Sequence, residues 1–337
     1  MPDALRIRFG LTVSVVAIVA TLLACDAVRV ARSDTGQPPG NSVTTGLRTI
    51  TLEVQRNTRE YMVYVPESYR TGDPWPVVVV FHGGGGNAES MLRTTGWDEE
   101  AEGERFLAVF PQGTAIDRPR RRSRRDGRFW NDGSGRESIP AARQNVDDIA
   151  FVNQLLADLE DRYSVDKRRV YATGFSNGAG MAFRVARELS TTFAAVAPVA
   201  GADWSPEAEP TRPVPVLYIT GDADPLNPLE GGAVRVGRRT MGTKPDVGEM
   251  LDEWVRINKC ERSRGITTKQ RGVTGVEYLD ETGKSGVILY TLKNHGHHWP
   301  GSESRLPARL VGPNTSTLDA AAIIWEFFEE HKLPAPR

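Results

Sequence analysis

Residues 170–181, Val-Tyr-Ala-Thr-Gly-Phe-Ser-Asn-Gly-Ala-Gly-Met, constrain the fold of this chain more than any other segment. Gly174, Ser176 and Gly178 form a Gly-x-Ser-x-Gly pattern, with β-forming residues before it and a helix-forming run after it. A serine in such a strand–turn–helix is held in a strained backbone conformation, and the flanking glycines prevent collisions with the neighbouring chain. The segment predicts a nucleophile elbow around Ser176. A glycine-rich turn without catalytic meaning is the alternative.

Such an elbow implies an acid and then a histidine further along the chain. His295, His297 and His298 follow an apolar run at residues 287–292, which predicts a strand that ends in a histidine-bearing loop. The sequence does not distinguish which of the three is the general base. No cysteine or carboxylate stands beside them at ligand spacing, so we expect no metal site. His331 falls near the end of an amphipathic segment, where we expect a solvated side chain.

The candidate acid follows the apolar run 215–220, in Gly-Asp-Ala-Asp-Pro at residues 221–225. Asp222 and Asp224 both stand where a carboxylate could orient the imidazole and stabilise its charged form. Capping of the loop is the other reading of either residue.

A glycine run follows another predicted buried strand, residues 76–81, in His-Gly-Gly-Gly-Gly-Asn at residues 82–87. Backbone N–H groups in such a loop can approach a substrate oxygen closely. An oxyanion hole of this chemistry takes one donor from this loop and one from Asn177, which follows the elbow serine. The run lacks a Gly-Lys-Ser/Thr ending, which disfavours a phosphate-binding loop.

These motifs resemble those of the polyhydroxybutyrate depolymerase and feruloyl esterase family of α/β-hydrolases. The resemblance extends over about residues 48–331. Its motifs are His-Gly…Asn at 82–87, Asn-Val-Asp-Asp-Ile-Ala-Phe at 145–151, Gly-Phe-Ser-Asn-Gly at 174–178, Gly-Asp-Ala-Asp-Pro-Leu-Asn-Pro at 221–228 with the glycines at 231 and 232, and Gly-His-His-Trp-Pro-Gly at 296–301. The resemblance implies a site made of Ser176 as nucleophile, Asp224 as acid, His297 as base, and the N–H groups of Gly84 and Asn177 as oxyanion donors, with Gly85 as a close competitor of Gly84.

The implied activity is hydrolysis of carboxylic esters by acyl transfer through a serine, with no metal or organic cofactor. Feruloyl or acetyl esters of plant polysaccharide and 3-hydroxybutyrate oligomers are the expected substrates, and Trp130 and Trp299, with Trp204 as a third, are candidates for an aromatic wall. Only two cysteines occur, which leaves Cys260 without a disulfide partner. Polymer depolymerases of the resembled family usually carry disulfides, and this departure from their pattern favours soluble or sugar-linked esters over solid polyester. A serine peptidase of the same fold and a non-catalytic surface lipoprotein that binds glycan or polyester are the alternatives. The complete serine, acid and histidine set disfavours the second.

The N-terminus predicts export. Arg6 and Arg8 precede an apolar run at residues 11–24, which is short for a membrane span and typical of a signal peptide. The run ends in Leu-Leu-Ala-Cys, which resembles a bacterial lipoprotein cleavage box with Cys25 as the lipidated residue. We therefore expect a signal peptide at residues 1–25, a flexible tether at 26–46 and an extracellular or periplasmic, membrane-anchored protein. An ordinary signal peptide that is cleaved slightly later is the alternative.

Strand-like and helix-like runs alternate from residue 47 to residue 334, which predicts one α/β domain. We expect an α/β-hydrolase fold, with a doubly wound, mostly parallel sheet, helices on both faces and an antiparallel edge made by the first two strands. The predicted strands are 49–54, 61–65, 77–81, 107–110, 170–173, 195–199, 216–220 and 287–292, and the predicted helices are 147–163, 179–189, 245–258 and 318–331.

The formal net charge is −1, which implies no bulk attraction to nucleic acid. One basic run, Arg-Pro-Arg-Arg-Arg-Ser-Arg-Arg at residues 118–125, departs from this balance. A solvated loop is one interpretation of this run. Contact with anionic lipid headgroups or acidic polysaccharide is the other.

Overall fold

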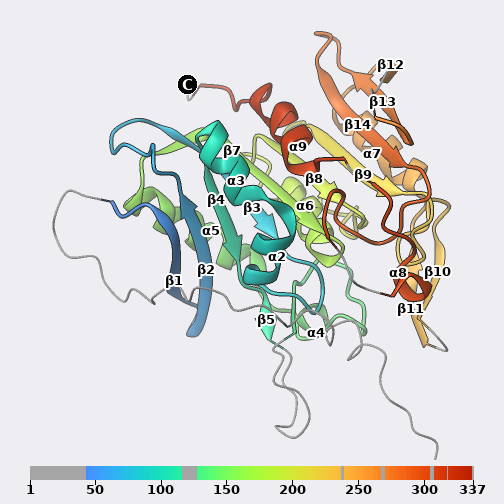
Figure 1. The fold of residues 1–337 in the computed structure, drawn as a ribbon, viewed down its shortest axis with the longest axis horizontal. Helices are drawn as coiled ribbons and strands as arrows, with labels where there is room; N and C mark the ends of the chain where they lie inside the picture. Colours follow the sequence, from blue (N-terminus) through green and yellow to red (C-terminus); the bar gives the residue numbers. More distant parts are fainter. Residues whose placement is uncertain are drawn as a thin grey trace, which may run out of the picture.

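The computed structural model describes residues 43–115, 127–236, 239–266, 270–303, 307–316 and 318–335. Within these residues a ten-stranded sheet crosses the molecule, with helices on both faces (Figure 1). In spatial order the strands are β1 (Gly46–Val54), β2 (Asn57–Val65), β4 (Leu107–Pro111), β3 (Trp75–Phe81), β7 (Val165–Phe175), β8 (Ala195–Val199), β9 (Val216–Gly221), β14 (Ser285–Leu292), β13 (Val273–Leu279) and β12 (Arg262–Ile266).

The middle of the sheet is parallel and both edges are antiparallel. Neighbouring strands from β4 to β14 pair in parallel, whereas β1 and β2 at one edge and β13 and β12 at the other pair antiparallel. The predicted fold class and the antiparallel first edge are confirmed. The second antiparallel edge is an addition, because β12 and β13 did not stand out from the sequence.

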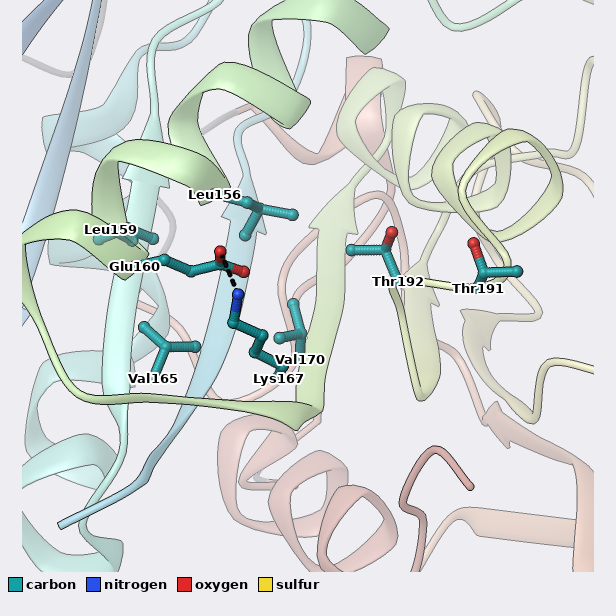
Figure 2. Close-up of a pocket in the computed structure, with 8 residues that line it drawn as sticks. All are labelled: Leu156, Leu159, Glu160, Val165, Lys167, Val170, Thr191 and Thr192. Atoms are coloured by element: carbon teal, nitrogen blue, oxygen red, sulfur yellow. Dashed lines mark hydrogen bonds and ion pairs between the residues drawn. The ribbon is translucent and has the colours of Figure 1, made fainter. Parts of the chain in front are cut away.

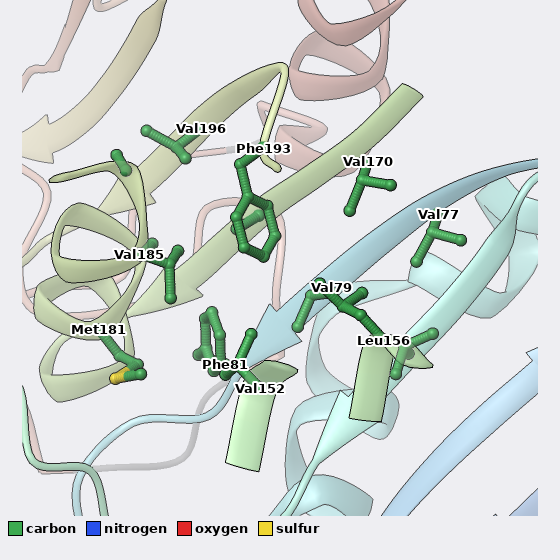
Figure 3. Packing of buried hydrophobic residues seen from close by; sticks show 14 of the residues in the cluster. Val77, Val79, Phe81, Val152, Leu156, Val170, Met181, Val185, Phe193 and Val196 are labelled. Atoms are coloured by element: carbon green, nitrogen blue, oxygen red, sulfur yellow. The ribbon is translucent and has the colours of Figure 1, made fainter. Parts of the chain in front are cut away.

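The sheet separates two apolar cores, and β3 contributes to both. Val77, Val79 and Phe81 pack on one face, whereas Val78 and Val80 pack on the other. Successive strand residues point to opposite faces, so a strand that is covered on both sides is apolar throughout. Figure 3 shows the first of these cores, where Val79 and Phe81 lie among side chains of the helices and of neighbouring strands.

Each core is closed by its own helices. The first core receives α5 (Asp148–Arg162), α6 (Asn177–Glu188) and α7 (Val247–Ile257). The second receives α2 (Ala88–Thr95), α3 (Trp97–Glu104) and α9 (Ala320–Glu329). Helices on opposite faces of a parallel sheet make the fold doubly wound. The predicted helices agree with α5, α6, α7 and α9 to within a few residues at each end.

The chain reverses its winding direction at β3, and this reversal positions the site. After β3 the chain passes to β4 on one side, and later places β7 on the other side of β3. Loops that leave β3 and β7 therefore diverge at the carboxyl ends of the strands. Open α/β sheets bind ligands at such a switch point.

Smaller elements lie outside the main sheet. They are the hairpin of β10 (Gly232–Val236) and β11 (Arg239–Lys244), the pair β5 (Thr114–Ala115) and β6 (Arg128–Phe129), and the short helices α4 (Pro140–Arg143) and α8 (Ala308–Val311). None of these was predicted from the sequence. They lie in the connections between the main strands and helices.

Several expectations fall outside the described residues. These are the signal peptide with Cys25, most of the proposed tether, and the whole basic run at 118–125. Within the part of the chain that the structure describes, no helix has the length and hydropathy needed to cross a membrane. The expectation for His331 was wrong, because this side chain is only 7% exposed and packs against Phe327.

Candidate active site

The sharp turn between β7 and α6 carries Ser176 in an unusual backbone conformation. Its φ is 57° and its ψ is −113°, and its N–H donates to the carbonyl of Val199 at 2.9 Å. A Cβ at Gly174 would collide with the carbonyl of Gly178, and a Cβ at Gly178 would collide with the backbone of Phe81. The two glycines of the motif are therefore required by the close approach of α6 to β7 and β3, as the pattern predicted.

A chain of hydrogen bonds connects Ser176 to two further predicted residues. The Ser176 Oγ lies 2.8 Å from Nε2 of His297, and Nδ1 of His297 lies 2.7 Å from Oδ2 of Asp224. Because a carboxylate only accepts, Nδ1 carries the proton and Nε2 is left to accept from the serine hydroxyl. The loops after β7, β9 and β14 thus bring together residues that are far apart in the sequence.

Asp224 is buried and firmly hydrogen-bonded. Its second oxygen, Oδ1, accepts from the backbone N–H groups of Leu226 at 2.8 Å and Asn227 at 2.9 Å. Burial alone would raise the pKa of Asp224, but its interactions with His297, with the Leu226 N–H and with the charge of Lys244 together lower this pKa below its usual value. The carboxylate is therefore held in its charged form next to the imidazole.

The competing residues have other partners. Asp222 is exposed, and its carboxylate accepts from the N–H of Asn294 at 2.5 Å. His295 and His298 are buried, and each bonds to backbone groups of the loops around them. Burial lowers the pKa of both histidines. Of the two acids and three histidines that the sequence left open, Asp224 and His297 are the pair that faces Ser176.

The predicted oxyanion donors lie next to each other. A Cβ added to Gly84 would stand 3.4 Å from the Cβ of Asn177. Asn177 is the first residue of α6, so its N–H has no acceptor within the helix. Among the hydrogen bonds of the described residues, none uses the N–H of Gly84, whereas the N–H of Gly85 donates to Arg128 at 2.8 Å. Gly85 is therefore the weaker candidate of the two glycines.

The side chain of Asn177 holds the neighbouring loop. Its amide accepts from the N–H of Trp130 at 2.8 Å, donates to the carbonyl of Trp130 at 3.1 Å and donates to Asp132 at 2.8 Å. The indole N–H of Trp130 in turn donates to the carbonyl of His82 at 2.9 Å. These bonds connect the elbow to the glycine loop through a side chain that the sequence had not assigned this role.

The predicted aromatic wall needs correction. Trp130 is fully buried, with its ring packed against Phe81 and His82, so it supports the loop from behind. Trp299 is 3% exposed and belongs to the second apolar core. Trp204 is partly exposed, and the guanidinium of Arg136 lies over its ring. Burial assigns Trp130 and Trp299 to packing, and leaves Trp204 as the ring that solvent can reach.

His82 was not predicted as part of the site, but it fixes the glycine loop. Its Nδ1 donates to the carbonyl of Gly83 at 2.9 Å, and its Nε2 accepts from the N–H of Gly113 at 3.0 Å. Because Nε2 can accept only when it carries no proton, the second bond requires the neutral ring, and burial lowers the pKa of His82 to about 4. A histidine between a buried strand and a glycine run was the signal that could have found it.

Asp148 supports the same loop from α5. Its carboxylate is fully buried, accepts from the N–H of Asn131 at 2.7 Å and pairs with Arg59 at 2.7 Å. Burial raises the pKa of Asp148 in spite of the opposing charge of Arg59. In the described parts of the chain, no three histidine, cysteine or acidic side chains are grouped so that they could hold a metal ion.

A separate hollow of about 200 Å³ lies at the other end of β7. Figure 2 shows Leu156, Leu159, Val165 and Val170 around it, with an ion pair between Lys167 and Glu160 at 2.7 Å. Thr191 and Thr192 complete the lining. The hollow contains none of the residues that surround Ser176.

The chain is similar to several known proteins. Residues 61–233 match the dienelactone hydrolase family. NocK of Nocardia uniformis subsp. tsuyamanensis, which is named as an esterase, is 31% identical over 86% of this chain and 84% of its own length. Feruloyl esterase C of Emericella nidulans is 29% identical over 81% of this chain and 85% of its own length.

Among solved structures, the acetyl xylan esterase from Aspergillus awamori has a TM-score of 0.54 at 14% identity and covers 84% of this chain and 99% of its own. The ferulic acid esterase from Anaeromyces mucronatus has a TM-score of 0.51 at 16% identity and covers 90% of this chain and 98% of its own. At these identities the two structures support the fold alone. The expected resemblance to feruloyl esterases is confirmed by the sequence relatives.

Proposed function

Because the chain belongs to the dienelactone hydrolase family and is an esterase of the feruloyl esterase type, we propose that Ser176, His297 and Asp224 form its catalytic triad. The observation that carries this proposal is the unbroken hydrogen-bond chain from the strained elbow serine through the imidazole to the buried carboxylate. This arrangement activates a hydroxyl that is otherwise a weak nucleophile.

The reaction proceeds in two halves. Ser176 Oγ attacks the ester carbonyl carbon as Nε2 of His297 takes its proton, and a tetrahedral oxyanion forms. His297 then gives the proton to the oxygen of the leaving alcohol, and the C–O bond breaks to leave an acyl-serine. Water, deprotonated by His297, attacks the acyl carbon, and the serine leaves with the returned proton.

Asp224 and the backbone donors have distinct parts in both halves. Asp224 keeps the proton on Nδ1 and stabilises the imidazolium that forms during each transfer. The N–H groups of Gly84 and Asn177 donate to the oxyanion, where negative charge develops in the transition state. The bonds of Trp130, His82 and Asn177 hold these donors in place beforehand.

We propose feruloyl or acetyl esters of plant polysaccharide as the substrates. The names of the relatives support this choice: feruloyl esterase C of Emericella nidulans and a bifunctional acetylxylan esterase/xylanase of Neocallimastix patriciarum are both similar to this chain. Oligomers of 3-hydroxybutyrate, which would use the same acyl transfer, are the other candidate substrate.

A fluorophosphonate probe and a substrate panel test the proposal. We expect the probe to label wild-type protein on Ser176, as mapped by peptide mass spectrometry, and to leave Ser176→Ala unlabelled. Methyl ferulate, acetylated xylan, p-nitrophenyl acetate and 3-hydroxybutyrate oligomers then compare the acyl groups. Labelling of another residue, or hydrolysis by Ser176→Ala at the wild-type rate, would refute the triad.

We also propose that the enzyme acts outside the cytoplasm, anchored through a lipid on Cys25. The basic residues, the short apolar run and the Leu-Leu-Ala-Cys box support this proposal. Labelled fatty acid should enter the wild-type protein and be absent from Cys25→Ser, which should become soluble. A mature N-terminus beyond residue 25 would contradict lipidation and leave a protein that is secreted or periplasmic.

A further inference from the structure

A buried polar network lies behind the acid loop. Asn227 donates its backbone N–H to Asp224, and its own side chain is almost fully buried. The side-chain amide donates to the hydroxyls of Tyr218 at 2.8 Å and Thr220 at 3.0 Å. The side-chain oxygen of Asn227, Oδ1, accepts a hydrogen bond from Nζ of Lys244. The side-chain nitrogen and oxygen of Asn227 are therefore both hydrogen-bonded to neighbouring residues. These bonds fix the position of Asn227, whose backbone N–H contacts Asp224.

Lys244 comes from outside the central sheet. It is the last residue of β11 in the hairpin, and its side chain is 9% exposed. Among the described residues the ammonium group has no ion pair with a carboxylate, and its hydrogen-bond partner is Asn227. Asp224 and Asp132 attract its charge, while Arg136 repels it. A buried cation without a paired carboxylate costs free energy of folding, so stability does not explain its position.

The lowered pKa of Lys244 agrees with an unfavourable free energy for burying its charge. Burial lowers the pKa of Lys244 to about 7, and the attraction of Asp224 only partly opposes that shift. The same lysine contributes to the lowered pKa of Asp224. Lys244 and the catalytic acid therefore act on each other without direct contact, with Asn227 between them.

The network continues to the nucleophile. The hydroxyl of Tyr218 donates to the carbonyl of Gly201 at 2.5 Å. Gly201 is packed so closely on the elbow that an added Cβ would collide with the carbonyl of Ser176. Hydrogen bonds between buried groups thus connect Lys244 to the loop that carries Asp224, and to Gly201, which packs against the turn at Ser176.

We propose that Lys244 is a positioning residue for the catalytic acid, which it orients by fixing Asn227 and, through it, the loop from Asp224 to Asn227. The inference rests on the proposed function, because it assigns a purpose to a group that acts on the triad. It also assigns a role to the β10–β11 hairpin, which holds a cation against the site from outside the sheet.

The decisive variant is Lys244→Met, which keeps most of the side-chain volume and removes the ammonium group. We expect kcat for p-nitrophenyl acetate to fall about ten- to a hundredfold, the range typical of residues that orient catalytic groups, with little change in KM. The unfolding temperature should stay the same or rise, because a buried charge is replaced by an apolar group. Lys167→Met, at the far end of β7, is the matched control and should retain wild-type kinetics.

Asn227→Ala tests the route of the effect. If Lys244 acts through Asn227, the double variant should lose no more kcat than Asn227→Ala alone, because residues in one network are not additive. The rate of fluorophosphonate labelling of Ser176 should fall in parallel with kcat. This readout does not depend on knowing the natural ester.

The outcomes separate the inference from the proposed function. Wild-type kcat and labelling rate in Lys244→Met would overturn the inference, as would a loss that only follows a lower unfolding temperature or a failure to fold. Additive losses in the double variant would overturn the route through Asn227. An absence of labelling at Ser176 in the wild-type protein would instead refute the triad itself.

Discussion

The two ends of β7 differ in what they offer a ligand. The amino end contributes Val165 and Val170 to a hollow of about 200 Å³ whose wall is part apolar and part polar and carries a solvent-facing ion pair. The carboxyl end leads into Ser176, where a strained backbone, an imidazole and a buried carboxylate meet. The hollow brings together no nucleophile, base and acid, whereas the elbow does. Reactivity follows from directed polar groups rather than from cavity size.

The direction of the strands explains this difference. At the carboxyl ends of β3 and β7 the chain diverges to either side, and α6 begins at Asn177 with unsatisfied N–H groups. At the amino ends the connections from α5 to β7 and from α6 to β8 only return the chain to the sheet. Donors for a developing negative charge therefore gather at one end of β7.

The largest effect is expected for Ser176→Ala. Loss of the proposed nucleophile should lower kcat on the order of 10⁶-fold while the protein remains folded. Initial rates with p-nitrophenyl acetate and a thermal unfolding curve of the same sample measure both quantities. If Ser176→Ala keeps more than a small fraction of wild-type activity, the conclusion that the reactive end of β7 is its carboxyl end would be wrong.

The next effect separates the two aspartates of one loop. Asp224→Asn should lower kcat roughly 10⁴-fold, because an amide cannot keep the proton on Nδ1 of His297. Asp222→Asn should cost less than about tenfold, since Asp222 bonds to the backbone of Asn294 and not to an imidazole. Comparable losses in both variants would contradict the assignment of the acid.

Asn177→Ala tests whether the elbow holds the loop beside it. The variant keeps the backbone N–H but loses three hydrogen bonds to Trp130 and Asp132. We expect kcat to fall about ten- to a hundredfold from misplaced oxyanion donors, together with a destabilisation of about 1–3 kcal/mol. Steady-state kinetics below the unfolding temperature separate the two effects. Unchanged kcat would show that the loop needs no such support.

The buried histidines predict loss of stability in acid. Burial lowers the pKa of both His82 and His331 to about 4, while the unfolded chain keeps the ordinary value near 6.5. As the pH falls from about 6.5 to about 4 the unfolded state takes up protons that the folded state refuses, so the free energy of unfolding falls. Each group contributes on the order of 1.4 kcal/mol per pH unit within this window.

His331→Phe isolates one of the two histidines. Nε2 of His331 has no hydrogen-bond partner among the described residues, and the ring already packs against Phe327. Urea unfolding at pH 7 and pH 5 should therefore show a smaller loss for His331→Phe than for wild type. Equal losses in the two proteins would contradict the assignment of this pH dependence to His331.

The smallest effect is expected at the amino end of β7. Lys167→Met removes an ion pair whose lysine is 71% exposed, and such pairs contribute about 0–1 kcal/mol. Activity should be unchanged, as measured with the same ester. A loss of activity would mean that the hollow communicates with Ser176, and the contrast between the two ends would need revision.

Local chemistry explains why the residues of the proposed triad could be found from sequence. The elbow requires glycines at fixed distances from Ser176, and the acid and histidine loops each follow an apolar strand, so short segments carry the signal. The choice of Asp224 over Asp222 and of His297 over its neighbours came from family resemblance. Both loops contain alternatives that only their folded positions distinguish.

The remainder depends on contacts between distant segments. Trp130 was expected to face a substrate, but Phe81 and His82 enclose its ring. His331 was expected in solvent, but it lies directly after α9, where residues on both sides of it pack into the second core. Lys244 had no local pattern at all, because its partner lies in another loop. Burial of an aromatic or charged residue is a property of the assembled fold, which composition and spacing do not encode.

The left-handed backbone of Ser176 implies a trade-off between stability and reactivity. A non-glycine residue in this conformation is strained by about 1–3 kcal/mol, and the cooperative packing of the sheet keeps it there. Ser176→Gly would relieve that strain, so the inactive variant should be more stable than the enzyme. A version of this protein that lost its activity would thus gain tolerance to further mutation.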